Sequence, residues 1–496
     1  MTMQSSPVSA GGPAPVSDPD LAARNRLVIL LLLVSAFTVI LNETIMGVAL
    51  PRLMKDLNVT ANAAQWLTTA FLLTMAVVIP ITGFLLQRLH TRTVFTMAMG
   101  LFSTGTLICA LSPGLGMLIF GRVVQACGTA IMMPLLMTTV MTLVPPESRG
   151  KTMGNISIVI SVAPAIGPTI SGIILNLLDW RWMFWLVLPI GLGALALGYA
   201  RLKNVTEPRK TPLDLISVPL SVLAFGGLVY GLSTLGEGQA AGHEGGNVPV
   251  WLPLAVGFVA LALFVARQVR LAPQGRALLD LRTFRVRVFS VAVVMMAFCM
   301  MSLFGMIILL PIYMQNVLGM EPLEAGLLLL PGGLAMGLMA PWVGRTFDRI
   351  GARRLVIPGA VLVFLGLGSM ALLGTGSTIW QVLSSHLLLS IGLALLFTPL
   401  FTSSLGSLPK ELYSYGSAVI GTVQQVAGAA GIALFVSIMS LRIGTEMATG
   451  AELVDATAAG VRAGFLTGGL IALLMIGASF FVRRPPVVKP QMPGSH

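Results

Sequence analysis

The sequence predicts an all-α polytopic membrane protein with fourteen transmembrane helices. Of its 496 residues, 56% are hydrophobic and 10% are charged, whereas about 25% of the residues of a soluble protein are charged. The mean hydropathy is +0.91. Apolar segments, each within or above the roughly 17–25 residues needed to cross a bilayer, follow one another along the chain. They lie at about 27–50, 64–86, 94–112, 115–144, 153–177, 183–200, 215–235, 250–266, 288–314, 323–343, 355–373, 379–406, 416–441 and 461–482.

The basic residues predict which side of the membrane each loop faces. With the N-terminus inside, 24 of the 30 Lys and Arg residues fall on the cytoplasmic side, five fall outside, and Arg122 lies in the membrane. Cytoplasmic loops are enriched in Lys and Arg. We therefore expect a multi-pass protein of the plasma (cytoplasmic) membrane with both termini in the cytoplasm. The same bias explains the net charge of +12 without a nucleic-acid partner.

Offsets between similar segments predict two six-helix halves and a two-helix insertion. Gly83 and Gly344 open related loop sequences 261 residues apart, and Pro51 and Pro311, 260 residues apart, are expected to end the first and ninth segments. Repeats related by an axis along the membrane normal are a known transporter plan. We predict a disordered tail at 1–24, a first half at 25–204, an insertion at 205–275, a second half at 276–484 and a second disordered tail at 485–496.

One acid and one base lie inside the predicted membrane segments. Glu43 is in the first segment, where a carboxylate costs about 2.5–3.5 kcal/mol on insertion scales, and all other Asp and Glu residues fall in loops, tails or helix ends. Arg122 cannot lose its charge and needs a partner. Each lies eight residues, about 12 Å, from the outer end of its segment. We expect them to pair in one conformational state; the alternative is that Arg122 bonds carbonyls and polar neighbours such as Gln125.

Polar and flexible side chains predict the lining of a substrate cavity. His386 lies 264 residues after Arg122, at the equivalent position of the second half, where it could titrate, bind substrate or simply pack. Methionines suit a pliable pocket, although they equally suit a surface facing lipid. The two adjacent glutamines of the thirteenth segment either line the cavity or bond between helices. The candidates are Asn42, Gln125, Met133, His386, Gln424 and Gln425.

Two further motifs concern helix packing and the cytoplasmic loops. The loop motif Gly-x-x-x-Asp-Arg-x-Gly-x-Arg is complete in the second half, whereas Gln87 and His90 replace its acid and second glycine in the first half. Its members are Gly83, Arg88 and Arg92, then Gly344, Asp348, Arg349, Gly351 and Arg353. In the fifth segment, glycines allow close helix approach and prolines free a carbonyl and bend the helix. These residues are Pro164, Gly167, Pro168 and Gly172.

With Arg122-x-x-Gln125-x-x-Gly128, these motifs resemble the major facilitator superfamily, specifically its fourteen-helix drug:proton antiporter branch. The resemblance implies the major facilitator fold, a loop acid that latches the cytoplasmic side, and a fifth-segment motif shared by antiporters. The branch commonly has Leu-Asp-x-Thr in the first helix. Here Asn42 takes the place of the acid and Glu43 follows it, a variant similar to lincomycin-resistance-type exporters.

The resemblance implies a proton-coupled antiporter that exports amphipathic drugs or lipophilic metabolites by alternating access. Glu43 would carry the proton, and the proton gradient would supply the energy, with no cofactor. The expected partners are small amphipathic molecules, protons and membrane lipids. The alternatives are a lipid or lipid-precursor translocator, or a membrane scaffold of the same fold. We expect no enzyme and no metal site, because the sequence has no nucleotide loop, metal cluster or nucleophile arrangement, and its three cysteines lie in apolar segments.

Overall fold

A computed structural model describes residues 19–202, 204, 214–238, 249 and 251–482. Within these residues, fourteen helical segments are long and apolar enough to cross a membrane, and the backbone contains helices without strands. Helices satisfy every backbone hydrogen bond within one segment, which the bilayer core requires. The predicted all-α class and the number of crossings are confirmed.

The helices are grouped by the predicted division into a first half, an insertion and a second half. The first half contains α1 (Pro19–Asp56), α2 (Ala61–Arg88), α3 (Thr91–Ala110), α4 (Leu115–Leu143), α5 (Arg149–Leu177) and α6 (Trp182–Arg201). The seventh crossing is α7 (Ser217–Ser221), the π-helical η2 (Val222–Gly226) and α8 (Gly227–Gly238), and the eighth is α9 (Trp251–Leu271). The second half contains α10 (Arg287–Asn316), α11 (Pro322–Ile350), α12 (Arg353–Met370), α13 (Ile379–Gly406), α14 (Tyr413–Ala448) and α15 (Leu453–Ser479). Short 3₁₀ turns connect some of them: η1 (Pro146–Ser148), η3 (Ala272–Gln274), η4 (Leu281–Arg285) and η5 (Lys410–Leu412).

Three predicted boundaries differ from the structure. Pro51 and Pro311 do not end their helices, since α1 continues to Asp56 and α10 to Asn316. The fixed φ of proline fits a helix, so each proline removes one hydrogen bond without forcing a stop, and membrane helices tolerate this loss. The first helix also begins at Pro19, inside the predicted tail, because proline suits a first helical turn.

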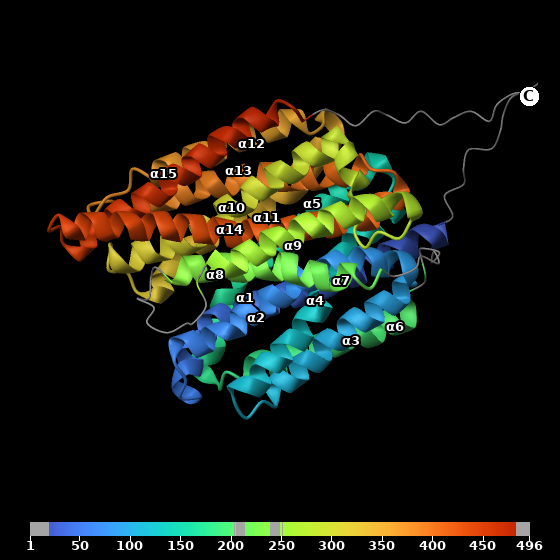
Figure 1. Cartoon of the computed structure of the whole chain (residues 1–496), viewed down its shortest axis with the longest axis horizontal. Helices are drawn as coiled ribbons and strands as arrows, with labels where there is room; N and C mark the ends of the chain where they lie inside the picture. The colour runs from blue at the N-terminus through green and yellow to red at the C-terminus, as the bar shows by residue number, and fades with distance from the viewer. Residues whose placement is uncertain (1–18, 203, 205–213, 239–248, 250, 483–496) are drawn as a thin grey trace, which may run out of the picture.

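The insertion lies over the seam between the two halves. In Figure 1, α8 runs between the blue helix α2 and the orange-red helix α14, and packs against both. At η2, Gly226 faces the side chains of Leu73 and Val77 of α2. Near the N-terminal end of α2, Trp66 stacks on Tyr230 of α8 with ring centroids 6.0 Å apart. The inserted helices therefore cover the lipid side of the α2–α14 seam.

The two halves also meet along a second seam, where α5 packs against α11. We call the end of the bundle with the α2–α3, α4–α5, α11–α12 and α13–α14 loops the basic end. It carries Arg88, Arg149, Arg349 and Lys410. The other end is called the opposite end. These two seams position the residues of the candidate site.

Candidate functional site

A buried polar network surrounds Arg122 in the middle of the first half. Arg122 is 1% exposed, and its Nη1 donates to Gln125 Oε1 at 2.7 Å and to Asn42 Oδ1 at 3.2 Å. Its Nε donates to the Leu67 carbonyl at 3.5 Å. The guanidinium lies 3.9 Å above the ring of Phe71, a cation–π contact that stabilises a desolvated charge. The positive charge of Arg122 is thus held by neutral groups.

The network extends from Arg122 along α4. Gln125 Nε2 donates to Thr106 Oγ1 of α3 at 2.8 Å, so both ends of this buried amide are bonded. Thr129 Oγ1 donates to the Gln125 carbonyl at 3.1 Å. The predicted pair Arg122 and Gln125 is therefore the centre of a chain of contacts that reaches one helical turn further, to Thr129.

Asn42, and not Glu43, faces Arg122 in this conformation. Thr44, two residues after Asn42, packs against Gly167 of α5 on the side of α1 that faces away from Arg122. Its Oγ1 lies 3.5 Å from the Ala163 carbonyl. Successive helical residues differ by about 100°. Glu43 therefore points between the α4 and α5 contacts of α1, and its side chain is half-buried. Because Arg122 donates a hydrogen bond to the adjacent residue Asn42, Glu43 lies close to the depth of Arg122 in the bundle.

A small cavity lies between the halves, next to this network. Its volume is about 90 Å³, and α2, α4, α13 and α14 form its walls. Three of the predicted cavity residues line it together: Met133, Gln424 and Gln425. Its other lining residues include Met75, Met137, Phe401, Thr129 and Ser417. Thr129 lines the cavity one helical turn after Gln125, so the cavity lies close to the Arg122 network.

His386 lies away from this cavity, between α13 and α11. It is 4% exposed, and its Nε2 is 3.0 Å from the Leu329 carbonyl. Gly332 of α11 leaves the space that the imidazole ring occupies. The geometry favours the packing alternative for His386.

The second-half loop motif connects the two halves at the basic end. Asp348 Oδ1 and Oδ2 accept from the backbone N–H groups of Gly150 and Lys151, each at 2.8 Å. These N–H groups open α5 and have no helical acceptor, so a carboxylate stabilises them. Gly344 lies against the Gly150 carbonyl, which allows α11 and α5 to approach closely. We call the contact of Asp348 with Gly150 and Lys151 the basic-end latch.

The remaining members of the motif have different positions. Gly351 ends α11 with φ +82°, a conformation that favours glycine. In the first half, His90 stands at the equivalent position with φ −64°, so no glycine is needed there. Arg349 and Arg353 are exposed. Arg92 lies 4.5 Å above the ring of Tyr199, and Arg88 lies 5.8 Å from the ring of Phe84.

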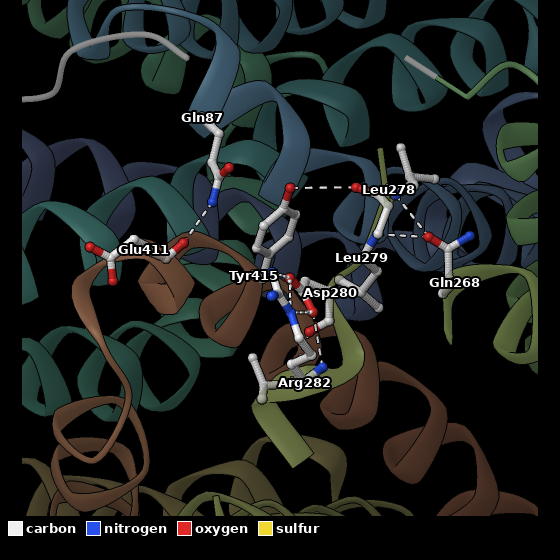
Figure 2. A network of polar contacts seen from close by, with 10 residues as sticks. Gln87, Gln268, Leu278, Leu279, Asp280, Arg282, Glu411 and Tyr415 are labelled. Atoms are coloured by element: carbon white, nitrogen blue, oxygen red, sulfur yellow. Dashed lines mark hydrogen bonds and ion pairs between the residues drawn. The ribbon is translucent and has the colours of Figure 1, made fainter. Parts of the chain in front are cut away.

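The first-half loop makes its own contact between the halves, with the opposite hydrogen-bond polarity. Gln87 Nε2 donates to the Glu411 carbonyl at 2.7 Å, as Figure 2 shows. Gly83, one turn before, faces Tyr415 and Ala418 of α14. Gln87 therefore donates a hydrogen bond at the position where the usual acid of the motif could only accept one.

Beside Gln87, the connector after α9 is tied to the second half and to the insertion. Figure 2 shows Tyr415 of α14 and Gln268 of α9 on either side of it. Tyr415 Oη donates to the Ala277 carbonyl at 3.4 Å. Gln268 Oε1 accepts from the N–H groups of Leu278 and Leu279. The insertion is thus anchored at the basic end through polar contacts.

The fifth-segment motif has one close contact. Gly167 accommodates Thr44 of α1, whereas Gly172 faces open space. Pro164 is half-buried within the continuous helix α5, and the side chain of Pro168 lies outside the described part of the chain. Of these two glycines, only Gly167 therefore lies close to a facing helix.

Sequence reasoning missed several residues that join the halves. Arg149 is buried, and its Nη2 donates to the Met141 carbonyl at 2.8 Å and to Tyr413 Oη at 3.3 Å. Thr138 bonds Ser417 at 3.2 Å, and Ser157 bonds Thr398 at 2.8 Å. Arg149 and Tyr413 are 264 residues apart, the offset that relates Arg122 to His386, so the repeat itself was a usable signal.

Comparisons with known proteins agree with this architecture. A family model described as Major Facilitator Superfamily matches residues 32–432. The chain is 40% identical over 471 residues to the uncharacterized MFS-type transporter YcnB of Bacillus subtilis, covering 95% of this chain and 98% of that protein. It is 39% identical over 463 residues to the lincomycin resistance protein LmrB of Bacillus subtilis, covering 92% and 95%.

Solved structures share the fold. The crystal structure of the human organic anion transporter MFSD10 matches with a TM-score of 0.65 at 15% identity, covering 92% of this chain and 99% of that chain. A double Trp mutant of XylE matches with a TM-score of 0.64 at 16% identity, covering 93% and 96%. In the described residues, no group of three or more His, Cys, Asp or Glu side chains could hold a metal ion.

Proposed function

The chain belongs to the Major Facilitator Superfamily of membrane transporters, and from this premise we propose that it exports amphipathic drugs or lipophilic metabolites in exchange for protons. Its relatives include proteins named for lincomycin resistance, at 38–39% identity. In the proposal the basic end faces the cytoplasm, in keeping with the positive-inside rule. The proton gradient drives the exchange.

One observation carries the proposal: Arg122 is bonded to Asn42, the neighbour of Glu43, and to Gln125, which lies one helical turn from the cavity residue Thr129. An ionised Glu43 would compete with Asn42 for the guanidinium, because an ionic partner is stronger than a neutral amide. A protonated Glu43 would not. The neutral pairing seen here is the one expected when Glu43 carries a proton.

In this mechanism, protonation of Glu43 selects between two arrangements of α1 and α4. Moving the Arg122 bond from Asn42 to Glu43 requires α1 to turn by up to about 100° or to shift its packing. Such a change disturbs Thr44, which is packed on Gly167 of α5. Because Gly150 and Lys151 of α5 are the N–H donors of the basic-end latch, the protonation state of Glu43 is coupled to opening of that end.

The present conformation is closed at the basic end. The contacts that join the halves, Asp348 to Gly150, Thr138 to Ser417 and Gln87 to the Glu411 carbonyl, lie in the part of the bundle nearest that end. Alternating access would break these contacts and open the cavity to the cytoplasm. The drug would then bind from the cytoplasmic side or the inner leaflet.

The test is drug accumulation in bacterial cells that overproduce the protein. We expect the wild type to lower the intracellular level of a lincosamide, and a protonophore to abolish this effect. Glu43→Gln should accumulate drug like cells without the protein, although it is made in equal amount. Glu147→Gln, the same change at an exposed basic-end residue, is the matched control and should export normally. Export by Glu43→Gln at the wild-type rate would contradict the proposal.

A further inference from the structure

The cavity between the halves has a neutral lining. Its described lining residues include no Asp, Glu, Lys, Arg or His. Polarity comes from two amides, Gln424 and Gln425, and two hydroxyls, Thr129 and Ser417; the remaining lining is mainly Met and aliphatic side chains. Uncharged groups of this kind bind hydrogen-bonding molecules without supplying a counter-ion.

Gln424 is the lining residue with unused hydrogen-bonding capacity. Its half-buried amide makes no hydrogen bond to other described residues, whereas Thr129 and Ser417 both donate to backbone carbonyls. The amide of Gln425 has only a weak contact, 3.9 Å to Met75 Sδ. A primary amide offers two donors and one acceptor oxygen. Gln424 is therefore ready to bond a ligand that has hydroxyl, amide or carbonyl groups.

The buried charge of Arg122 disfavours a cation in the cavity. Arg122 lies seven residues before Thr129 on α4, about 10 Å along the helix. At this distance and an effective dielectric constant of about 20, the charge of Arg122 would weaken binding of a monovalent cation roughly 15-fold while Glu43 is protonated. Removing the cation from water without a counter-ion adds to this penalty. An uncharged molecule meets neither cost.

The methionines and the seam explain how such a small cavity could hold a larger molecule. Drug-sized sites span about 300–1,000 Å³, more than the present 90 Å³. Met75, Met133 and Met137 are unbranched and can repack around different shapes. Since α2 and α4 belong to one half and α13 and α14 to the other, separation of the halves at the basic end would widen the cavity. The inserted helices keep its lipid side covered.

We propose that this cavity binds its substrate as an uncharged, hydrogen-bonding amphipathic molecule, with the Gln424 amide as a direct contact, and that it discriminates against permanent cations. The inference rests on the proposed antiport function. It has an electrical consequence. Exchange of one proton for an uncharged molecule moves one net charge per cycle, so a membrane potential alone drives export, whereas exchange for a monovalent cation would be electroneutral.

The test uses the full chain in proteoliposomes preloaded with either chloramphenicol, which is uncharged, or ethidium, a permanent cation. An inside-negative potassium diffusion potential is set with valinomycin at equal pH on both sides. We expect the potential to accelerate chloramphenicol efflux, and ethidium efflux to be at least tenfold slower. The inference would be overturned if ethidium efflux were as fast as chloramphenicol efflux, or if the rate of chloramphenicol efflux did not depend on the membrane potential. Either result would still be compatible with the antiport proposal.

A gain of function gives a second arm. Gln424→Glu places a carboxylate in the cavity and should raise ethidium efflux at least tenfold relative to the wild type, while chloramphenicol efflux falls. Gln315→Glu, which adds the same charge at an exposed position at the end of α10, should change neither rate. An unchanged ethidium rate in a folded Gln424→Glu protein would count against the assigned contact. If neither compound moves under a potential and a pH gradient together, the antiport proposal itself fails.

Discussion

Removal of the Asp348 carboxylate should shift the protein toward a state that is open at the basic end. Asp348 accepts two backbone N–H bonds of 2.8 Å from Gly150 and Lys151. A hydrogen bond to a charged group contributes about 1.5–3 kcal/mol, and the lower value for each gives about 3 kcal/mol. Asp348→Ala should therefore raise the ratio of open to closed molecules roughly 100-fold. Asp348→Asn keeps one acceptor oxygen and should give roughly a tenfold increase.

The distance between the two halves at the basic end measures this shift. Spin labels on Glu147→Cys and Lys410→Cys occupy exposed positions in different halves, and the half-buried native Cys127 is replaced by alanine to prevent its labelling. Pulsed electron spin resonance should show a longer-distance population that grows in the order wild type, Asp348→Asn, Asp348→Ala. Asp455→Asn, an exposed acid in the first turn of α15, is the control. If Asp348→Ala keeps the wild-type distance distribution, the latch does not hold the halves together.

Three other predictions follow from neighbouring contacts. Gly344→Ala places a methyl group against the Gly150 carbonyl, whereas Gly326 on the same helix faces open space. Gly344→Ala should therefore slow transport at least tenfold, and Gly326→Ala should leave the transport rate unchanged. Equal transport rates for the two variants would refute the close approach of α11 and α5. Gln87→Asp restores the motif acid, but the aspartate cannot donate a hydrogen bond to the Glu411 carbonyl. The spin labels at positions 147 and 410 should therefore report an open basic end about fivefold more often than in the wild type. A smaller open population than in the wild type would show that the hydrogen bond donated by Gln87 is unimportant. The Arg267 guanidinium beside Asp214, together with Ser217, holds the pKa of the Asp214 carboxyl well below its usual range. The ionised Asp214 therefore stabilises the fold at pH values above its unfolded pKa of about 3.9. This stabilisation is lost as the pH falls through the lower folded pKa. Asp214→Asn should therefore cost about 2 kcal/mol at pH 7 and lower the thermal midpoint relative to the wild type. The difference in stability should begin to narrow around pH 4 and shrink further as the pH falls below that; a difference that closes near pH 6 would assign the effect to another group.

Hydropathy and loop motifs were enough to predict the framework. The fourteen crossings follow from segment length, and the resemblance of the complete second-half motif to the family implied the latch of Asp348. These features depend on residue type and spacing along the chain, which the sequence displays directly. The contact of Arg149 with Tyr413 was missed, although the two residues are separated by the repeat offset of 264.

The rotation of α1 could not be predicted, because it depends on packing. Asn42 and Glu43 differ by one position, and α1 is apolar on most of its circumference, so no periodicity indicates which of them faces α4. The contact of Thr44 with Gly167 fixes the rotation and places Asn42 on Arg122. Membrane helices that are apolar on all sides carry little information about which face meets which neighbour.

The place of the insertion was hidden for the same reason. Its helices are apolar, and nothing in their composition indicates the α2–α14 seam. The side of contact is set by small residues such as Gly226, which faces α2, and by the polar anchor of Gln268 at the basic end. The role of Gln87 was equally hidden, since its partner is a backbone carbonyl that no sequence motif marks.

Drug-induced proton movement in proteoliposomes tests the central claim most directly. Vesicles loaded with a pH-sensitive dye contain the wild type, Glu43→Gln or the control Glu147→Gln, and a lincosamide is added to one side. The account predicts a proton flux in the wild type and in Glu147→Gln, and none in Glu43→Gln. A flux of wild-type size in Glu43→Gln would contradict the assignment of Glu43 as the proton carrier.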